Sequence, residues 1–341
     1  MKQLIFLLVF FTGIANNAFS QADLKQAKKK FNTAVRYIDE KDYDQALYNL
    51  NLTVNIRADF EKAYLERGKI FLRRGELENA RNDFNKAIQY GNQMGEAYFY
   101  RGLLKYHEEK SSQAIEDFTI AVQSEYKDAK VYYFRGLAYY KTHDYSNAIL
   151  NYTMAIDGKY DFFHAYHDRA TAKFDNGDYQ GAISDYQTAL KYNSQAPFLY
   201  NNLGNAYLKR SDYENAISQF TKGISIDPNY YKAYLGRGNA HASLEHYEDA
   251  LSDYQKAIQI NDSCYQAYNN MGIVSLKKTD YEKSIDYFNK ALDIRDQSGE
   301  VYLNRGLAWE NIGKFENACR DWTMALELGM EEANEYLKDC E

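Results

Sequence analysis

Two histidines three positions apart are the first residues in this sequence that could do chemistry. His164 and His167 fall on one face of a predicted helix, with Asp161 and Asp168 beside them. Imidazole nitrogens at such a spacing can hold a metal ion. No third ligand stands at a metal-site spacing, so the sequence predicts a solvated helix face here. The two histidines remain the candidates if a metal site exists.

A recurring arginine could bind anions. It lies sixteen residues before an aspartate in five places: Arg67/Asp83, Arg101/Asp117, Arg169/Asp185, Arg237/Asp253 and Arg305/Asp321. Where Leu203 or Met271 replaces the arginine, the aspartate is lost too, and only Arg135, opposite Asn151, breaks the rule. This joint loss favours a structural salt bridge between two helices over a row of free arginines for acidic ligands, because a paired arginine is already satisfied.

Patterns typical of catalysis are missing from the sequence. It contains no phosphate-binding loop, no G-x-S-x-G and no Cys/His nucleophile pattern. None of the 48 acidic residues forms a distinctive carboxylate pair. The sequence therefore predicts a protein that is not an enzyme and that needs no cofactor.

The elements that carry these residues repeat every 34 positions. The segment from Tyr231 to Cys264 shows the unit, with two apolar stripes at helical spacing separated by a short turn at Glu245-His246. At multiples of 34 positions from Gly238, each of the remaining units has a glycine or an alanine. Ala250 meets alanine or serine, and Tyr254 meets an aromatic residue or Leu50. A fixed period with two helices per unit predicts an all-α solenoid.

The small residues also suggest how the two helices of a unit meet. A glycine or alanine on the first helix is expected to face the alanine on the second, so that the helix axes approach closely. The aromatic residue four positions later is expected to fill the gap towards the next unit.

This 34-residue pattern of small, small, aromatic and small residues resembles the tetratricopeptide repeat. The resemblance covers about nine tenths of the chain, and the usual proline near the end of each unit appears only as Pro228. It implies a right-handed superhelical solenoid of antiparallel helix pairs. The predicted units are residues 27–60, 61–94, 95–128, 129–162, 163–196, 197–230, 231–264, 265–298 and 299–332, followed by a C-terminal capping helix at 333–341.

The resemblance also implies a binding groove on the concave side, lined by the first helices. In the C-terminal half the implied groove residues are Asn201, Asn202, Asn205, Asn239, Asn269, Asn270 and Asn304. In the N-terminal half the implied residues include Phe31, Leu65, Leu72, Phe99, Tyr106, Tyr133 and Tyr140. An asparagine amide both donates and accepts, so such a row suits the backbone of an extended peptide.

Two further interpretations of the groove residues stay open. The asparagines could simply be solvated while the apolar residues pack between units. Alternatively, the aromatic residues and the two histidines of repeats 3–5 could bind a glycan, a small ligand or a metal ion. The expected function is a non-catalytic scaffold or adaptor that binds a partner protein or extended peptide. The net charge of −7 argues against nucleic acid.

The first twenty residues look like a cleaved secretory signal. Lys2 precedes an apolar run from Leu4 to Phe11, and Ala18-Phe19-Ser20 provides a cleavage site before Gln21. The run is too short to span a bilayer, so no membrane span is expected in the mature chain. We therefore expect export to a bacterial periplasm or cell exterior, as part of the cell envelope.

Three cysteines and several turn residues complete the sequence-based picture. Cys319 occupies a slot that is aliphatic in other units, which suggests a small buried hydrophobe, although a bridge to Cys340 is also open. Glycines at the turns are expected to adopt positive φ. Aspartates before the second helices are expected to cap them: Asp42, Asp144, Asp178, Asp212 and Asp280.

Overall fold

A computed structural model describes residues 21–341 apart from residues 93, 339 and 341. The predicted signal peptide at residues 1–20 lies outside this part. The chain divides into two compact units, Met1–Asp161 and Phe162–Glu341. Every regular element in the described residues is a helix, which confirms the predicted all-α solenoid.

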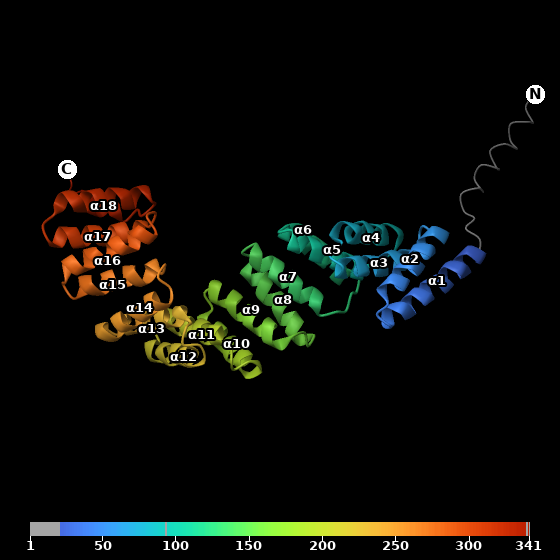
Figure 1. Ribbon diagram of the computed structural model, residues 1–341, viewed down its shortest axis with the longest axis horizontal. Coiled ribbons are helices and arrows are strands. Elements are labelled where there is room, and N and C mark those ends of the chain that lie inside the picture. Colours follow the sequence, from blue (N-terminus) through green and yellow to red (C-terminus); the bar gives the residue numbers. More distant parts are fainter. Residues whose placement is uncertain (1–20, 93, 339, 341) are drawn as a thin grey trace, which may run out of the picture. The chain divides into compact units, whose positions relative to one another are not determined.

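The helices of both units follow one another in antiparallel pairs (Figure 1). The first unit holds α1 (Gln21–Asp39), α2 (Tyr43–Ile56), α3 (Glu61–Arg73), α4 (Leu77–Tyr90), α5 (Gly95–His107), α6 (Ser111–Gln123), α7 (Lys130–Lys141) and α8 (Tyr145–Asp157). The second unit holds α9 (Phe162–Asp175), α10 (Tyr179–Tyr192), α11 (Pro197–Lys209), α12 (Tyr213–Ile226), α13 (Tyr231–Ser243), α14 (Tyr247–Ile260), α15 (Tyr265–Lys277), α16 (Tyr281–Ile294), α17 (Gly299–Asn311), α18 (Phe315–Glu327) and α19 (Ala333–Leu337).

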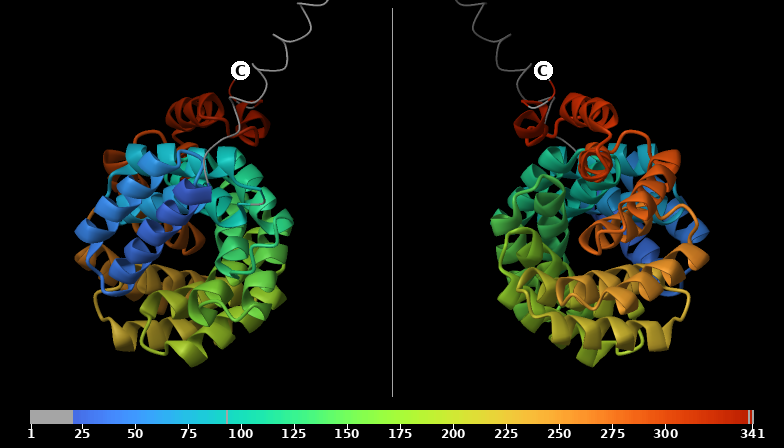
Figure 2. Two further views of the ribbon diagram at one scale, coloured as in Figure 1. Left: turned by 90° about the vertical axis from the view of Figure 1, so that its right-hand side faces the viewer. Right: turned by 90° about the vertical axis from the view of Figure 1, so that its left-hand side faces the viewer.

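Odd-numbered helices up to α17 are the first helices of their pairs, and even-numbered helices are the second. Each pair packs on the next within its unit, and within one unit the successive pairs are rotated relative to one another in the end-on views (Figure 2). None of the described helices is both long enough and apolar enough to cross a membrane.

The core of every pair after the first is built on an aromatic ring from the second helix, and the first pair has the buried Leu50 in that position. Tyr254 is 1% exposed, and a Cβ added to Gly238 would lie 2.6 Å from its ring. The first-helix glycine therefore abuts this ring. It also faces the small residue of the second helix as predicted, because Ser284, in the alanine position of its repeat, donates from Oγ to the carbonyl oxygen of Gly272 at 2.8 Å. Phe220 also abuts Gly236 of the following pair, so the ring does fill the gap between units as expected.

The turns inside the pairs follow the predicted chemistry with one exception. Gly75, Gly177 and Gly313 have φ values of 76°, 84° and 74°. The predicted side-chain caps form at Asp42, Asp144, Asp178 and Asp212, each accepting a backbone N–H of the second helix. The prediction was wrong for Asp280, whose side chain makes no cap hydrogen bond.

A disulfide fastens the C-terminal end of the second unit. Cys319 in α18 is bonded to Cys340, so its interpretation as a simple buried hydrophobe was wrong. Cys264 is buried and free. The capping helix α19 ends at Leu337, earlier than the predicted end at 341, and Cys340 beyond it is bonded to Cys319 of α18.

Candidate functional site

The repeated arginine is held from several directions at once. Arg237 donates from Nε and Nη2 to the two carboxylate oxygens of Asp253, at 2.8 and 2.7 Å. Its Nη1 donates to Thr221 on α12 of the preceding pair, at 3.1 Å. The predicted pairing with aspartate is present in all five repeats: Arg67–Asp83, Arg101–Asp117, Arg169–Asp185, Arg237–Asp253 and Arg305–Asp321.

A tyrosine one turn earlier also contacts this arginine. The guanidinium of Arg237 lies over the ring of Tyr234, 5.6 Å from its centroid. The hydrogen bond and charge of Asp253 outweigh burial and raise the pKa of Arg237. At the exception, Arg135 has Asn151 opposite in place of an aspartate, and burial lowers its pKa. The arginines are therefore structural clamps between repeats, not free anion sites.

The asparagines of the second unit form a hydrogen-bonded chain across three first helices. Asn270 on α15 donates to Oδ1 of Asn239 on α13 at 2.7 Å, and the Tyr254 hydroxyl donates to the same oxygen at 2.9 Å. Longer contacts of 3.5 Å join Asn270 to Asn269 and Asn269 to Asn304 on α17. The amides thus lie in one row along successive first helices.

The row is only partly accessible. Asn201 and Asn269 are 6% and 4% exposed, so the prediction that they offer a groove surface does not fit the structure. Both sit where a first helix meets its neighbour, which covers their side chains. The remaining predicted amides are half-buried and keep part of their surface: Asn202, Asn205, Asn239, Asn270 and Asn304.

A hollow of about 240 Å³ opens beside this row in the second unit. Its polar wall consists of Asn239, Asn270 and the Tyr254 hydroxyl, and its lining is completed by Ala242, Ile273 and Val274. The Nδ2 group of Asn239 donates to no described residue. The Nδ2 group of Asn239 is therefore available to donate to a ligand in this hollow, whose lining is partly polar and partly apolar.

The aromatic residues predicted for the first unit mostly pack against other side chains. Phe99 is 2% exposed and stacks on Tyr126 at 5.3 Å, so it belongs to the core and not to a groove. Tyr106 lies under the ammonium group of Lys141, 4.5 Å from the ring centroid. Tyr133 and Tyr140 are half-buried against Tyr160 and Tyr145.

Two hollows that share Glu66 lie along α1, α3 and α5 of the first unit, with further lining from α2 and from the segment after α6, in place of the predicted aromatic groove. The first, about 430 Å³, is lined by Ile38, Tyr43, Glu66, Lys69, Ile70, Leu72, Arg73 and Tyr100. The second, about 370 Å³, is lined by Phe31, Lys62, Leu65, Glu66, Met94, Gly95, Glu96, Ser124, Glu125 and Tyr126. Phe31, Leu65 and Leu72 were predicted from their first-helix positions, whereas the charged residues of the lining were not.

A charged bridge lies on the face that holds these two hollows. Lys69 on α3 donates to Glu66 at 2.9 Å and to Glu96 on α5 at 3.0 Å. Burial lowers the pKa of Lys69, but the hydrogen bonds and charges of the two glutamates outweigh it, and the pKa is raised. The face therefore joins apolar surface to carboxylates of fixed position.

The histidine pair singled out in the sequence is not part of a three-ligand cluster in the described residues. His164 is exposed, whereas His167 meets Asp168 through Nδ1 at 2.8 Å. The other ring nitrogen of His167 lies 3.4 Å from Asn202, and its ring stands edge-on to Phe198. His167 thus belongs to the polar network of α9 and α11.

Comparisons with known proteins agree with the geometry. Sequence models described as "Tetratricopeptide repeat" match residues 61–90, 101–160, 197–230, 231–264 and 265–298, and one described as "TPR repeat" matches 170–211. No curated protein matches the sequence.

Two solved structures share the fold. A tetratricopeptide repeat protein from Parabacteroides merdae is 18% identical, with a TM-score of 0.62 over 72% of this chain and 98% of its own. The C-terminal part of a TPR repeat-containing protein from Cytophaga hutchinsonii is 20% identical, with a TM-score of 0.58 over 70% of this chain and 98% of its own. The chain belongs to the tetratricopeptide repeat family, whose members are generally non-catalytic protein-interaction scaffolds.

Proposed function

We propose that this protein is a non-catalytic scaffold that holds an extended segment of a partner protein along its first-helix faces. The observation that carries the proposal is the asparagine row beside the hollow of the second unit. An asparagine amide offers two donor hydrogens and an acceptor oxygen, and a peptide backbone needs both kinds of partner. Asn239 keeps its donors for a ligand at this hollow.

The first unit supports the same function with a different surface. Its two hollows join apolar floors to the Glu66, Lys69 and Glu96 bridge. Apolar hollows bind the apolar side chains of a partner, whereas carboxylates of fixed position favour partner groups that are basic or that donate hydrogen bonds. The first unit is thus suited to holding a partner through its side chains, and the second unit to holding a partner through its backbone.

We further propose that the protein works outside the cytoplasm of a bacterium, in the cell envelope. The residues Met1–Ser20 have the organisation of a signal peptide. The disulfide between Cys319 and Cys340 supports this location, because disulfides persist in oxidising compartments and are rare in the cytosol. Cell fractionation with thiol labelling tests it: Cys319 and Cys340 should resist alkylation until the sample is reduced.

Affinity capture tests the scaffold function. The mature chain, residues 21–341, is compared with the N202A/N270A/N304A variant in envelope extract. Losing about three hydrogen bonds of roughly 1 kcal/mol each should weaken partner binding by about a hundredfold. The N79A/N147A/N215A variant is the matched control, because it removes three exposed asparagines from second helices. Equal binding by both triple variants would contradict the proposed grip.

A further inference from the structure

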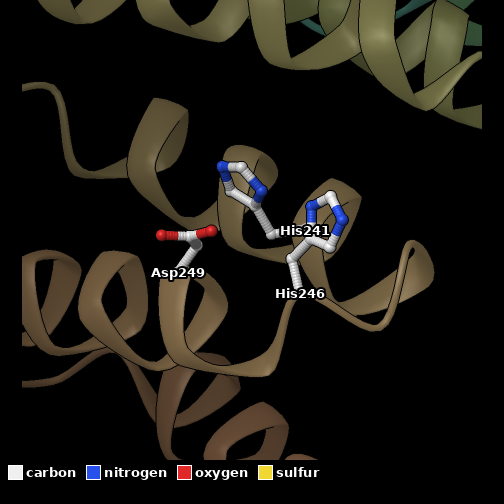
Figure 3. A group of neighbouring side chains, drawn as sticks. All are labelled: His241, His246 and Asp249. Carbon is white, nitrogen blue, oxygen red and sulfur yellow. The ribbon is translucent and has the colours of Figure 1, made fainter.

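A cluster of metal-ligating side chains lies at the turn between α13 and α14. His241, His246 and Asp249 each bring one ligand atom to within 4.8 Å of the other two. Figure 3 shows the ring of His241 between His246 and Asp249, with one of its nitrogens turned towards the His246 ring. No sequence motif marks this cluster, because its members lie on both sides of a turn.

The backbone of the turn brings the two imidazoles together. His241 lies in the last turn of α13, and His246 stands at the N-cap position of α14. Glu245 between them adopts a φ of 61°, and the N–H of His246 donates to the carbonyl oxygen of His241 at 2.9 Å. The ring centroids are 6.0 Å apart. Asp249 follows in the first turn of α14.

This combination of residues is peculiar to one repeat. The positions equivalent to His241 carry Tyr37, Phe71, Lys105, Tyr139, Lys173, Tyr207, Ser275 and Trp309. Those equivalent to His246 carry Asp42, Glu76, Lys110, Asp144, Asp178, Asp212, Asp280 and Lys314. Those equivalent to Asp249 carry Gln45, Asn79, Gln113, Asn147, Gly181, Asn215, Lys283 and Asn317. No other repeat places more than one metal-ligating side chain at these three positions, so the solenoid itself does not require the cluster.

One ligand atom of the cluster is also unsatisfied. Nδ1 of His241 is buried and has no hydrogen-bond partner among the described residues. A buried polar atom without a partner is costly, and a bound cation would remove that cost. His246 and Asp249 are exposed, so their side chains are free to turn towards such a cation.

The distances and donor types define the kind of ion. Four ligands at about 2.0 Å from a tetrahedral ion lie about 3.3 Å apart, so the three atoms must close by at most about 1.5 Å. Rotation of the exposed His246 and Asp249 side chains covers that distance. Two imidazoles with one carboxylate suit zinc, copper, nickel or cobalt, whereas magnesium and calcium prefer oxygen ligands alone.

The charges around the cluster also suit a cation. Arg237, one turn before His241, is the nearest fixed positive charge on α13, but its guanidinium is held by Asp253. Glu248, beside Asp249, is paired with Lys278 of the next repeat. Asp249 itself is in no ion pair with a described residue.

We propose that His241, His246 and Asp249 bind one divalent transition-metal ion, with zinc as the probe, and leave its remaining position to water or to a group of a partner. The ion would tie the end of α13 to the start of α14. This site is separate from the first-helix faces and stands or falls independently of the scaffold function.

Isothermal titration of the mature chain with zinc, and absorption spectroscopy with cobalt, test the proposal. The expected result is one strong zinc site per chain and the visible absorption bands of tetrahedral cobalt. The H241Y/H246N variant should lose both, with affinity falling at least about a hundredfold. Both replacements suit the fold, because tyrosine occupies the first position in three other repeats and asparagine is a good N-cap residue.

The H164N/H167N variant is the matched control, since it also removes two histidines from the second unit. It should bind zinc and cobalt as the unaltered chain does. The proposal is overturned if the unaltered chain binds no zinc, if H241Y/H246N keeps its affinity, or if the site disappears in H164N/H167N instead. Circular dichroism of each variant establishes that a lost site is not a lost fold.

Discussion

The arginine clamp between helix pairs gives the sharpest prediction for stability. In the R237L variant, the carboxylate of Asp253 would lose two hydrogen bonds while remaining only 5% exposed. A buried charge deprived of its partner costs about 3–5 kcal/mol. Removing the carboxylate should cost less stability than removing the arginine. In a D253Q variant the side chain of Arg237, which is 22% exposed, can turn to solvent. We expect that change to cost about 1–2 kcal/mol.

The sixth repeat shows how the cost can be cancelled. Leu203 and Gln219 stand there at the positions of Arg237 and Asp253. The R237L/D253Q double variant copies that pair and leaves no buried charge. It should therefore lie within about 1 kcal/mol of the unaltered protein, well below the sum of the two single changes.

Hydrogen exchange measured peptide by peptide is the right assay, because a solenoid opens locally. Amides of α13 and α14 in R237L should lose roughly a hundredfold to several thousandfold in protection, while those of α17 and α18 serve as an internal reference. The double variant should recover most of that protection. Unchanged exchange in R237L, or a double variant as labile as the sum of both singles, would refute the account of the arginines as clamps.

Three further predictions concern the end of the chain, its packing and its pH dependence. The C319S/C340S variant should lose about 3 kcal/mol, as expected for a loop spanning 21 residues, measured as faster exchange in α18 and α19; unchanged exchange would show that the bridge is dispensable. The G272L variant should lose about 3 kcal/mol in its free energy of unfolding by urea, because a Cβ at Gly272 already lies 2.5 Å from the ring of Phe288. An unchanged free energy of unfolding would contradict the packing described here. Burial raises the pKa of Tyr186 to about 12, above its unfolded value of about 10, so its contribution to stability is complete below pH 10 and is lost between pH 10 and 12. The Y186F variant should therefore lose less stability than the unaltered protein over that range, and parallel pH profiles would contradict this.

The fold was predictable because its constraint recurs in every unit. The alternation of small and aromatic residues every 34 positions leaves few ways to bury both helices of a pair. The Arg–Asp contact was predictable for a related reason, since Leu203 and Met271 mark the joint loss of both partners. The repeats thus contain several versions of the Arg–Asp contact within one chain, and these can be compared with one another.

The site was less predictable because exposure depends on how pairs pack on one another. Phe99 and Tyr133 both occupy first helices, yet Phe99 is buried and Tyr133 is not. The hollows around Glu66 and Lys69 depend on gaps between neighbouring helices, which no spacing rule describes. The histidine cluster at α13 and α14 was missed because its members lie on two helices, and only the turn between them brings the side chains together.

Site-specific photocrosslinking tests the scaffold function most directly. A benzophenone amino acid is placed at Ile273 or Leu72 on first helices, or at Tyr48 or Leu150 on the exposed surface of second helices. We predict that, after illumination in intact cells, the first-helix positions crosslink to one partner protein and the second-helix positions do not. Crosslinks to that partner only from Tyr48 and Leu150 would place its binding on the opposite surface and contradict the account.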